Sequence, residues 1–226
     1  MRLTDYIRRY DVLPSEGLLY DIPLRKEYIL REIGRGKRVL DLGCLGGQIS
    51  KLIKDQNNDV YGVEANPRAA ETAERRGIRV KVFDLNDGVP FEDGHFDAVN
   101  AGEIIEQVYD TKFLFEECNR VLKPQGVFLF TTPNLNSLAN RLRVLAGDYL
   151  SQHGAYPDDR GGERIRVFNI QKIHELCRHT GFQVVDVLGV PARERGAIGF
   201  TLLRPIVRVM PQLGELLVVK ARRLDH

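Results

Sequence analysis

The sequence predicts an α/β fold whose core is a mostly parallel β-sheet with helices on both faces. Short apolar segments alternate with amphipathic, helix-compatible segments from residue 38 to residue 131, and this alternation is typical of βαβ units. A loop with three glycines follows the first apolar segment, and acidic residues stand at the ends of successive strands. Together these observations indicate a doubly wound sheet that binds a ligand at the carboxyl ends of its strands.

The size and hydrophobic content of the chain suit one globular domain. The chain has 226 residues, of which 43% are hydrophobic, and this is enough for one substantial core. We therefore expect a single domain that spans residues 1–226.

Charge and cysteine content indicate which partners, metals and cellular setting to expect. The 33 basic and 31 acidic residues give a net charge of +2, so no nucleic-acid partner is expected. Cys44, Cys118 and Cys177 lack the spacing of a metal site, and we expect no metal. These cysteines favour a reduced, cytoplasmic protein, and we see neither a signal core nor an apolar run long enough to span a bilayer.

Hydrophobic periodicity and boundary residues place the individual elements. The expected strands cover residues 38–42, 60–64, 78–83, 96–100, 127–131, 183–188 and 216–221. The expected helices cover residues 20–33, 48–53, 67–76, 110–122, 137–145 and 170–180. Asn66 and Asn169 can cap the helices that follow them, and Gly77 and Gly181 can end those helices.

The loop after the first strand has the composition of a cofactor loop. It reads Gly43-x-x-Gly46-Gly47 and is preceded by Asp41. Glycines allow a sharp turn and a close approach by a ligand, and the helix start behind them offers unpaired N–H groups. A dinucleotide fold would place G-x-G-x-x-G here. An acid before the loop would repel a pyrophosphate, so the pattern favours a cofactor with a cationic end.

The ends of the next two strands carry acids that fit the same ligand. Glu64 lies 21 residues after Gly43, where nucleotide-binding βαβ units hold a ribose diol. Asp84 follows the third strand.

The Asp41 to Gly46 pattern, D-x-G-x-x-G, resembles motif I of the class I S-adenosylmethionine (SAM)-dependent methyltransferases. Phe96-Asp97-Ala98-Val99 followed by Glu103-Ile104-Ile105-Glu106, and then Thr132-Pro133-Asn134, resemble later segments of that family. The likeness covers roughly residues 35–190. It implies a Rossmann-like sheet of seven strands, mostly parallel, with the last strand antiparallel and placed inside the sheet.

The resemblance also implies a ligand set. SAM would be the cofactor and S-adenosylhomocysteine its product. Asp84 would accept a hydrogen bond from the exocyclic amine of the adenine. The cofactor-binding residues would be Asp41, Gly43, Gly46, Glu64, Ala65, Asp84, Leu85, Ala101 and Glu103.

The implied function is methyl transfer from SAM to a small-molecule acceptor, and a hydroxyl is the favoured acceptor group. The sequence is most similar to the quinone-biosynthesis and the sugar or glycolipid methyltransferases. One alternative is a non-catalytic SAM-binding regulatory or scaffold protein. Another is a nicotinamide-dependent oxidoreductase, although its G-x-G-x-x-G is absent.

The candidate catalytic residues are Glu106, Gln107 and His153. Many O-methylating members of the family carry histidine at the position of Gln107, and glutamine can orient a hydroxyl but cannot take its proton. Glu106 follows the fourth strand and can accept a proton if it is partly buried. Arg166 can bind an anionic group of the substrate or hold the lid.

Two long connections interrupt the pattern. Residues 133–168 far exceed the usual loop of about 4–6 residues, and within them we predict a mobile lid at 145–165. Residues 191–214 carry apolar side chains at helical spacing among arginines. This second insertion is consistent with packing on the sheet or on a second subunit of a homodimer, and with peripheral contact with a membrane or an apolar substrate tail.

Overall fold

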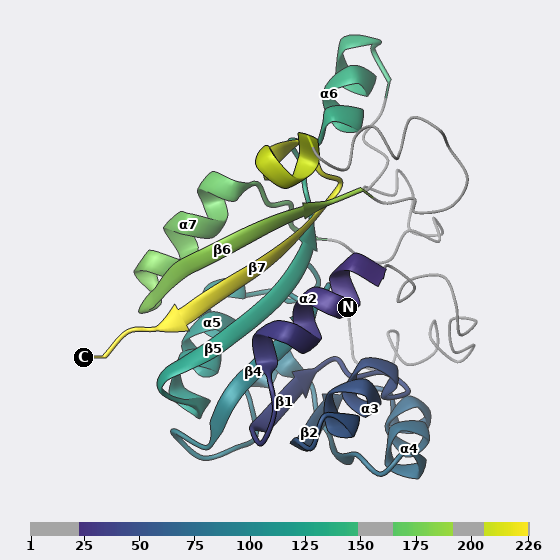
Figure 1. The fold of residues 1–226 in the computed structure, drawn as a ribbon, viewed down its shortest axis with the longest axis vertical. Helices are drawn as coiled ribbons and strands as arrows, with labels where there is room; N and C mark the ends of the chain where they lie inside the picture. The colour runs from purple at the N-terminus through teal and green to yellow at the C-terminus, as the bar shows by residue number, and fades with distance from the viewer. Residues whose placement is uncertain (1–22, 149–164, 192–205, 226) are drawn as a thin grey trace.

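The computed structural model describes residues 23–148, 165–191 and 206–225. They build one sheet of seven strands in the order β3-β2-β1-β4-β5-β7-β6 (Figure 1). The strands are β1 (Arg38–Leu42), β2 (Asp59–Glu64), β3 (Arg79–Val82), β4 (Phe96–Gly102), β5 (Leu122–Pro133), β6 (Phe182–Val190) and β7 (Leu216–Arg223). β1 to β5 pair in parallel, and β7 runs antiparallel between β5 and β6. The predicted fold class is confirmed.

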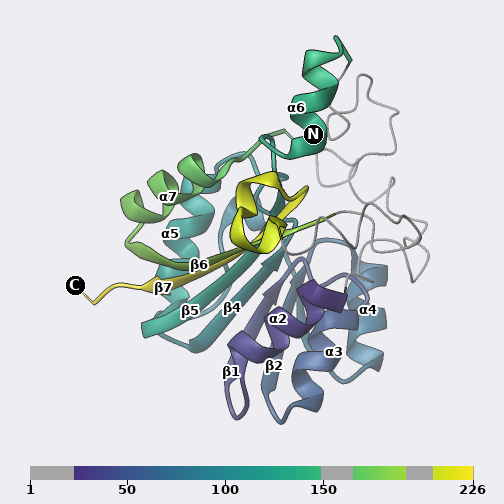
Figure 2. The same cartoon turned by 45° about the horizontal axis from the view of Figure 1, so that its top comes forward.

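Helices cover both faces of the sheet (Figures 1 and 2). The described helices are α2 (Pro23–Ile33), α3 (Gln48–Asp55), α4 (Pro67–Arg75), α5 (Thr111–Val121), α6 (Leu138–Leu145) and α7 (Ile170–His179), with the short 3₁₀ turns η1 (Leu85–Asp87) and η2 (Pro211–Leu213). One apolar cluster joins α2, α3 and α4 to one face. A second joins α5 and α7 to the other, so the sheet is doubly wound.

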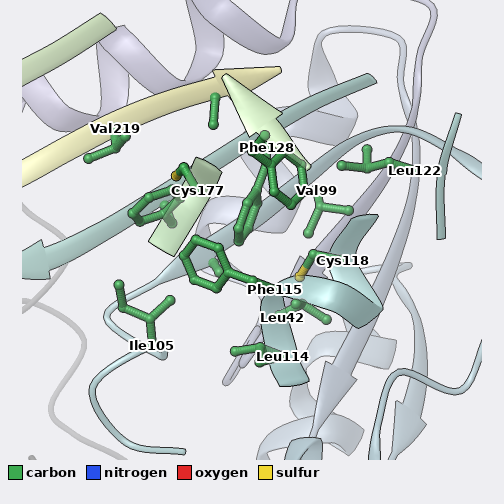
Figure 3. Packing of buried hydrophobic residues seen from close by; sticks show 14 of the residues in the cluster. Leu42, Val99, Ile105, Leu114, Phe115, Cys118, Leu122, Phe128, Cys177 and Val219 are labelled. Atoms are coloured by element: carbon green, nitrogen blue, oxygen red, sulfur yellow. The ribbon is translucent and has the colours of Figure 1, made fainter. Parts of the chain in front are cut away.

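The second cluster is centred on aromatic side chains. The ring centroid of Phe115 lies 5.0 Å from that of Phe128 in an edge-to-face arrangement, and Cys118 and Cys177 are fully buried beside them (Figure 3). Burying each such ring contributes about 1.5–3 kcal/mol. This core fixes the positions of β4 and β5, and the predicted site residues Glu106 and Gln107 follow the carboxyl end of β4.

The boundary residues behave as expected. The Asn66 side chain accepts hydrogen bonds from the backbone N–H groups of Arg68 and Ala69, and Asn169 accepts one from Lys172. Gly77 and Gly181, with φ of 79° and 76°, stand in the left-handed conformation that glycine tolerates.

Several strands are longer than the sequence indicated, among them β6, which covers Phe182–Val190, and β7, which continues to Arg223. β4 continues to Gly102, and β5 starts at Leu122 rather than at Val127. In β5 the predicted turn is absorbed as an irregularity in the ladder, with Gln125 at φ 61°. Residues 206–209 form one helical turn, and the side chain of Val207 packs close to Gly189 of β6. The described part of the second insertion therefore lies on the sheet.

Candidate functional site

The sheet has its topological switch point between β1 and β4. From β1 the chain adds β2 and β3 on one side, and from β4 it adds β5 on the other. Ligands bind outside the carboxyl ends of the strands at such a point. The loops after β1, β2, β3 and β4 meet there, and the predicted cofactor-binding residues lie in these loops or at the ends of the strands that lead into them.

The glycine loop needs its glycines for different reasons. Gly43 has φ 64°, and a Cβ at this position would collide with the side chain of Ile104. Gly47 caps α3 with φ 77°, and a Cβ there would come within 2.9 Å of the Cβ of Ala73. The loop is thus held between the segment after β4 on one side and α4 on the other.

Glu64 is anchored by the backbone before any ligand binds. Its Oε2 accepts a hydrogen bond from Leu45 N at 2.9 Å, and its Oε1 accepts one from Asn66 N at 2.8 Å. The residue is only 2% exposed. Burial raises the pKa of the carboxyl, although N–H donors, including those of Asn66 and Leu45, oppose the shift. The carboxylate is therefore oriented by the glycine loop itself.

Asp41 is buried beneath the same loop. Its Oδ1 accepts from Asn100 Nδ2 at 2.6 Å and its Oδ2 accepts from Ser50 Oγ at 2.5 Å, so the carboxylate joins β1, β4 and α3. Burial raises the pKa of Asp41, and the two hydrogen bonds partly counter this. The predicted contact with a cationic ligand group depends on the remaining lone pairs.

Arg25 is a residue that sequence reasoning missed. Its guanidinium is 2% exposed and forms a 2.8 Å salt bridge with Glu103. Glu103 is a non-glycine residue with φ 57°, held by hydrogen bonds from its N–H to the carbonyl and the hydroxyl of Thr131. A signal existed, because Arg25 shares the buried stripe of α2 with Tyr28, Ile29 and Ile33, and an arginine on an apolar stripe requires an anionic partner.

Asp84 stands where the third strand ends. Its Oδ1 accepts from the backbone and the side-chain amide of Asn86 at 2.9 and 2.8 Å. The Asn86 Oδ1 in turn accepts from Tyr109 N at 2.8 Å. This places Asp84 and the partly buried Leu85 beside the loop that follows β4.

Glu106 lies on the other side of that loop, toward β5. It is 1% exposed, and its Oε2 accepts from Thr132 Oγ1 at 3.0 Å. Gln107 donates a side-chain hydrogen bond to the carbonyl of Glu103. The loop after β4 thus presents Glu103 toward Arg25 and Glu106 toward β5.

Comparison with known sequences decides the family. A family described as "Methyltransferase domain" matches residues 18–187. The chain belongs to the SAM-dependent methyltransferases. The methyltransferase is 30% identical over 181 residues to a ubiquinone biosynthesis O-methyltransferase of Pseudomonas aeruginosa, and 76% of each chain is covered.

Two further likenesses bear on this methyltransferase. It is 29% identical over 143 residues to a ubiquinone biosynthesis O-methyltransferase of Alkalilimnicola ehrlichii, a match that spans 59% of this chain and 58% of that relative. Its fold resembles 1,6-didemethyltoxoflavin-N1-methyltransferase of Burkholderia thailandensis, solved with S-adenosylhomocysteine bound, with a TM-score of 0.67, 19% identity and coverage of 99% of this chain and 87% of that one.

SAM is the cofactor of this methyltransferase, and the residues present fit it. The glycine loop, in which Gly43 and Gly47 have no room for a Cβ, and the backbone-anchored carboxylate of Glu64 converge at the switch point. The buried Arg25 and the acid Asp84 lie beside them. Among the described residues, no group of three metal-ligating side chains occurs and no helix is long and apolar enough to cross a membrane.

The predicted site residues of the methyltransferase fall into two sets. Asp41, Gly43, Gly46, Glu64, Ala65, Asp84, Leu85, Ala101 and Glu103 lie in or just before the four converging loops. Glu106 and Gln107 lie in the loop after β4, and their predicted catalytic roles stay predictions. His153 and most of the predicted lid at 145–165 lie outside the described residues, so both stay predictions.

Proposed function

We propose that this methyltransferase methylates a hydroxyl group of a small molecule. The observation that carries the proposal is a buried carboxylate, Glu106, which lies in the loop after β4 and next to Thr132 of β5. The similarity to ubiquinone biosynthesis O-methyltransferases supports an oxygen acceptor.

The cofactor would be held at three points. Glu64 would accept hydrogen bonds from the ribose hydroxyls, because its carboxylate is already fixed by Leu45 and Asn66. Asp84 would accept from the adenine amine. Arg25 would pair with the carboxylate of the methionine moiety, since a buried guanidinium beside Glu103 can bind a second anion in a charge-assisted, bidentate manner.

SAM supplies an electrophilic methyl group on a sulfonium. The chain must hold the acceptor oxygen in line with that methyl group, and such positioning can lower the barrier by about 7–11 kcal/mol. As the new C–O bond forms and the C–S bond breaks, the hydroxyl proton must leave. Glu106 is the carboxylate to receive it on the acceptor side, because Gln107 has no basic atom and donates to the backbone.

The acceptor would carry an apolar portion. Leu142, Val144 and Leu145 of α6 are 57%, 58% and 84% exposed, and α6 contacts η2. Val209 and Met210, just before η2, are 82% and 43% exposed. Arginines lie between these apolar side chains. The pattern supports an acceptor with an apolar tail, which the enzyme would bind in solution or at a membrane surface. The buried free thiols Cys44, Cys118 and Cys177 support a reducing, cytoplasmic setting.

Two experiments test the proposal. The first is isothermal titration calorimetry with S-adenosylhomocysteine and with NAD⁺. The second measures transfer of a labelled methyl group from SAM to matched phenols, alcohols and amines. Binding of S-adenosylhomocysteine but not of NAD⁺, with label appearing on a phenol or alcohol, supports it. Label on amines alone would overturn O-methylation. Binding without transfer to any acceptor would instead support a regulatory SAM-binding protein.

A further inference from the structure

Side chains tie together the loops at the carboxyl edge of the sheet. The Asp84 carboxylate accepts a hydrogen bond from the side-chain amide of Asn86, and the Asn86 side-chain oxygen accepts one from the backbone N–H of Tyr109. This links the end of β3, where the adenine would lie, to the loop after β4. Both contacts are hydrogen bonds of 2.8 Å, and the bond between Asn86 and Tyr109 joins the two loops, so a shift of one loop against the other would break it.

A second tie joins the loop after β4 to residues 165–168. The Arg166 guanidinium donates to the carbonyl of Tyr109. The backbone N–H groups of Ile165 and Arg166 both donate to the carbonyl of Glu106, at 3.0 and 3.3 Å. Phe168 then bridges to Asn134 at the end of β5, and its carbonyl accepts from Leu135 N. The segment therefore spans the loops after β4 and β5.

The peptide of Tyr109 is the point where the two ties meet. Its N–H faces Asn86, and its carbonyl faces Arg166. The same segment that Arg166 anchors also contacts the backbone of Glu106, the candidate proton acceptor. A continuous chain of hydrogen bonds thus runs from Asp84 on the cofactor side to Glu106 on the acceptor side.

We propose that Arg166 is a positioning residue that couples occupancy of the adenine site to the order of the acceptor wall formed by residues 165–168. The inference rests on the proposed function, because it takes Asp84 as the adenine acceptor. An adenine amine bonded to Asp84 stabilises the Asn86 turn, which stabilises Tyr109 and through Arg166 the wall. Linkage makes the effect reciprocal: a loosened wall weakens cofactor binding.

This role differs from direct binding of an anionic substrate group by Arg166. A substrate-binding arginine would change acceptor affinity and leave the empty wall and the cofactor affinity untouched. A positioning arginine changes both in the absence of any acceptor. The two roles are therefore separated by measurements with S-adenosylhomocysteine alone.

The test combines hydrogen exchange with calorimetry on the full chain. In the wild type, S-adenosylhomocysteine should slow amide exchange in peptides covering 165–168 by about fivefold or more. In Arg166→Met, we expect less than about a twofold slowing and a Kd for S-adenosylhomocysteine about 3–10-fold higher, as for the loss of one hydrogen bond. Arg166→Lys, which keeps a donor for the Tyr109 carbonyl, should recover part of both effects.

Asn86→Ala interrupts the same series of hydrogen bonds at its cofactor end. It replaces Arg166→Met in the test if thermal melting shows that Arg166→Met folds poorly. It should also abolish the slowing at 165–168. The matched control is Arg178→Met, an exposed arginine of α7, which should behave like the wild type. Unchanged exchange response and unchanged Kd in Arg166→Met would overturn the coupling alone. If the wild type fails to bind S-adenosylhomocysteine, the proposed function falls and the coupling falls with it.

Discussion

The cofactor half and the acceptor half of this molecule are built in different ways. In the cofactor half, Glu64 and Asp84 sit at strand ends and are held by groups in a nearby loop or turn. Glu64, for example, accepts from Leu45 and Asn66. Asp41 and Arg25 are held instead by side chains from other elements. In the acceptor half, Glu106 contacts Thr132 and the segment at 165–166, which are far away in the sequence.

This difference separates binding from catalysis in physical terms. The protein carboxylates on the cofactor side, such as that of Glu64, are preorganised by the fold, so changes there should alter the affinity for the cofactor. The acceptor side is assembled by contacts between distant loops, so changes there that leave the bonds between Asn86 and Tyr109 and between Tyr109 and Arg166 intact should alter turnover while cofactor binding remains.

The largest effect is expected for Glu106→Gln. The glutamine oxygen can still accept from Thr132 Oγ1, so the fold should persist. Loss of the proton acceptor should lower kcat by about 10²–10⁴-fold, while calorimetry with S-adenosylhomocysteine should give the wild-type Kd. Thr132→Val, which removes the donor and keeps the carboxylate, is the matched control and should cost far less activity. A Glu106→Gln enzyme with near-normal kcat would remove Glu106 from the mechanism.

Arg25→Met should have the next largest effect. It leaves the carboxylate of Glu103 without its 2.8 Å partner, and breaking a buried ion pair costs about 3–5 kcal/mol. Urea unfolding should show this loss of stability, and binding of S-adenosylhomocysteine should disappear. The double variant Arg25→Met/Glu103→Gln should regain much of the stability without regaining affinity. If that double variant bound S-adenosylhomocysteine normally, Arg25 would not hold the cofactor carboxylate.

Glu64→Ala should weaken S-adenosylhomocysteine binding by about 10–100-fold, since a charged hydrogen bond contributes about 1.5–3 kcal/mol. The expected defect is in affinity, measured by calorimetry on folded protein. Asp59→Ala is the control: this acid lies at the start of the same strand and its side chain is 43% exposed. Equal affinities for Glu64→Ala and the wild type would end the ribose assignment.

Most of the cofactor half could be predicted from the sequence because its determinants are local. Asn66 and Gly77 bound α4 through contacts within a few residues, and the offset between Gly43 and Glu64 follows from one βαβ unit. The glycines carry their own signal, since positive φ and close packing leave few alternatives. The exceptions are Arg25, whose partner Glu103 is 78 residues away, and Asp41, whose partner Asn100 is 59 residues away.

The acceptor half could be predicted only in outline. Glu106 was recognisable as a candidate, but its partner Thr132 is 26 residues away. The bond from Arg166 to the Tyr109 carbonyl spans 57 residues and ends on a backbone atom, which has no sequence signature. Interactions of this kind depend on how two loops meet over the sheet, and a single sequence does not specify that.

The smallest effect is a pH dependence with opposite signs for stability and affinity. Burial raises the pKa of both Asp41 and Glu64 above their ordinary values of 3.8 and 4.5. A carboxyl whose pKa is higher in the folded state binds protons more tightly there, so its contribution to stability grows as the pH falls through that raised pKa and is lost as the pH rises. Cofactor binding needs the charged carboxylate of Glu64, so the affinity for S-adenosylhomocysteine should fall over the same pH range.

Comparing wild type with Asp41→Asn by urea unfolding between pH 7 and about pH 5 isolates the Asp41 contribution, because the acids whose pKa values are lowered, such as Asp97 and Glu117, act equally in both proteins. The wild type should gain stability relative to Asp41→Asn as the pH falls, while its affinity for S-adenosylhomocysteine declines. A stability difference that does not change with pH would show that Asp41 is already neutral or is not stabilised by protonation, and parallel rather than opposite trends would show that Glu64 does not bind the cofactor in its charged form.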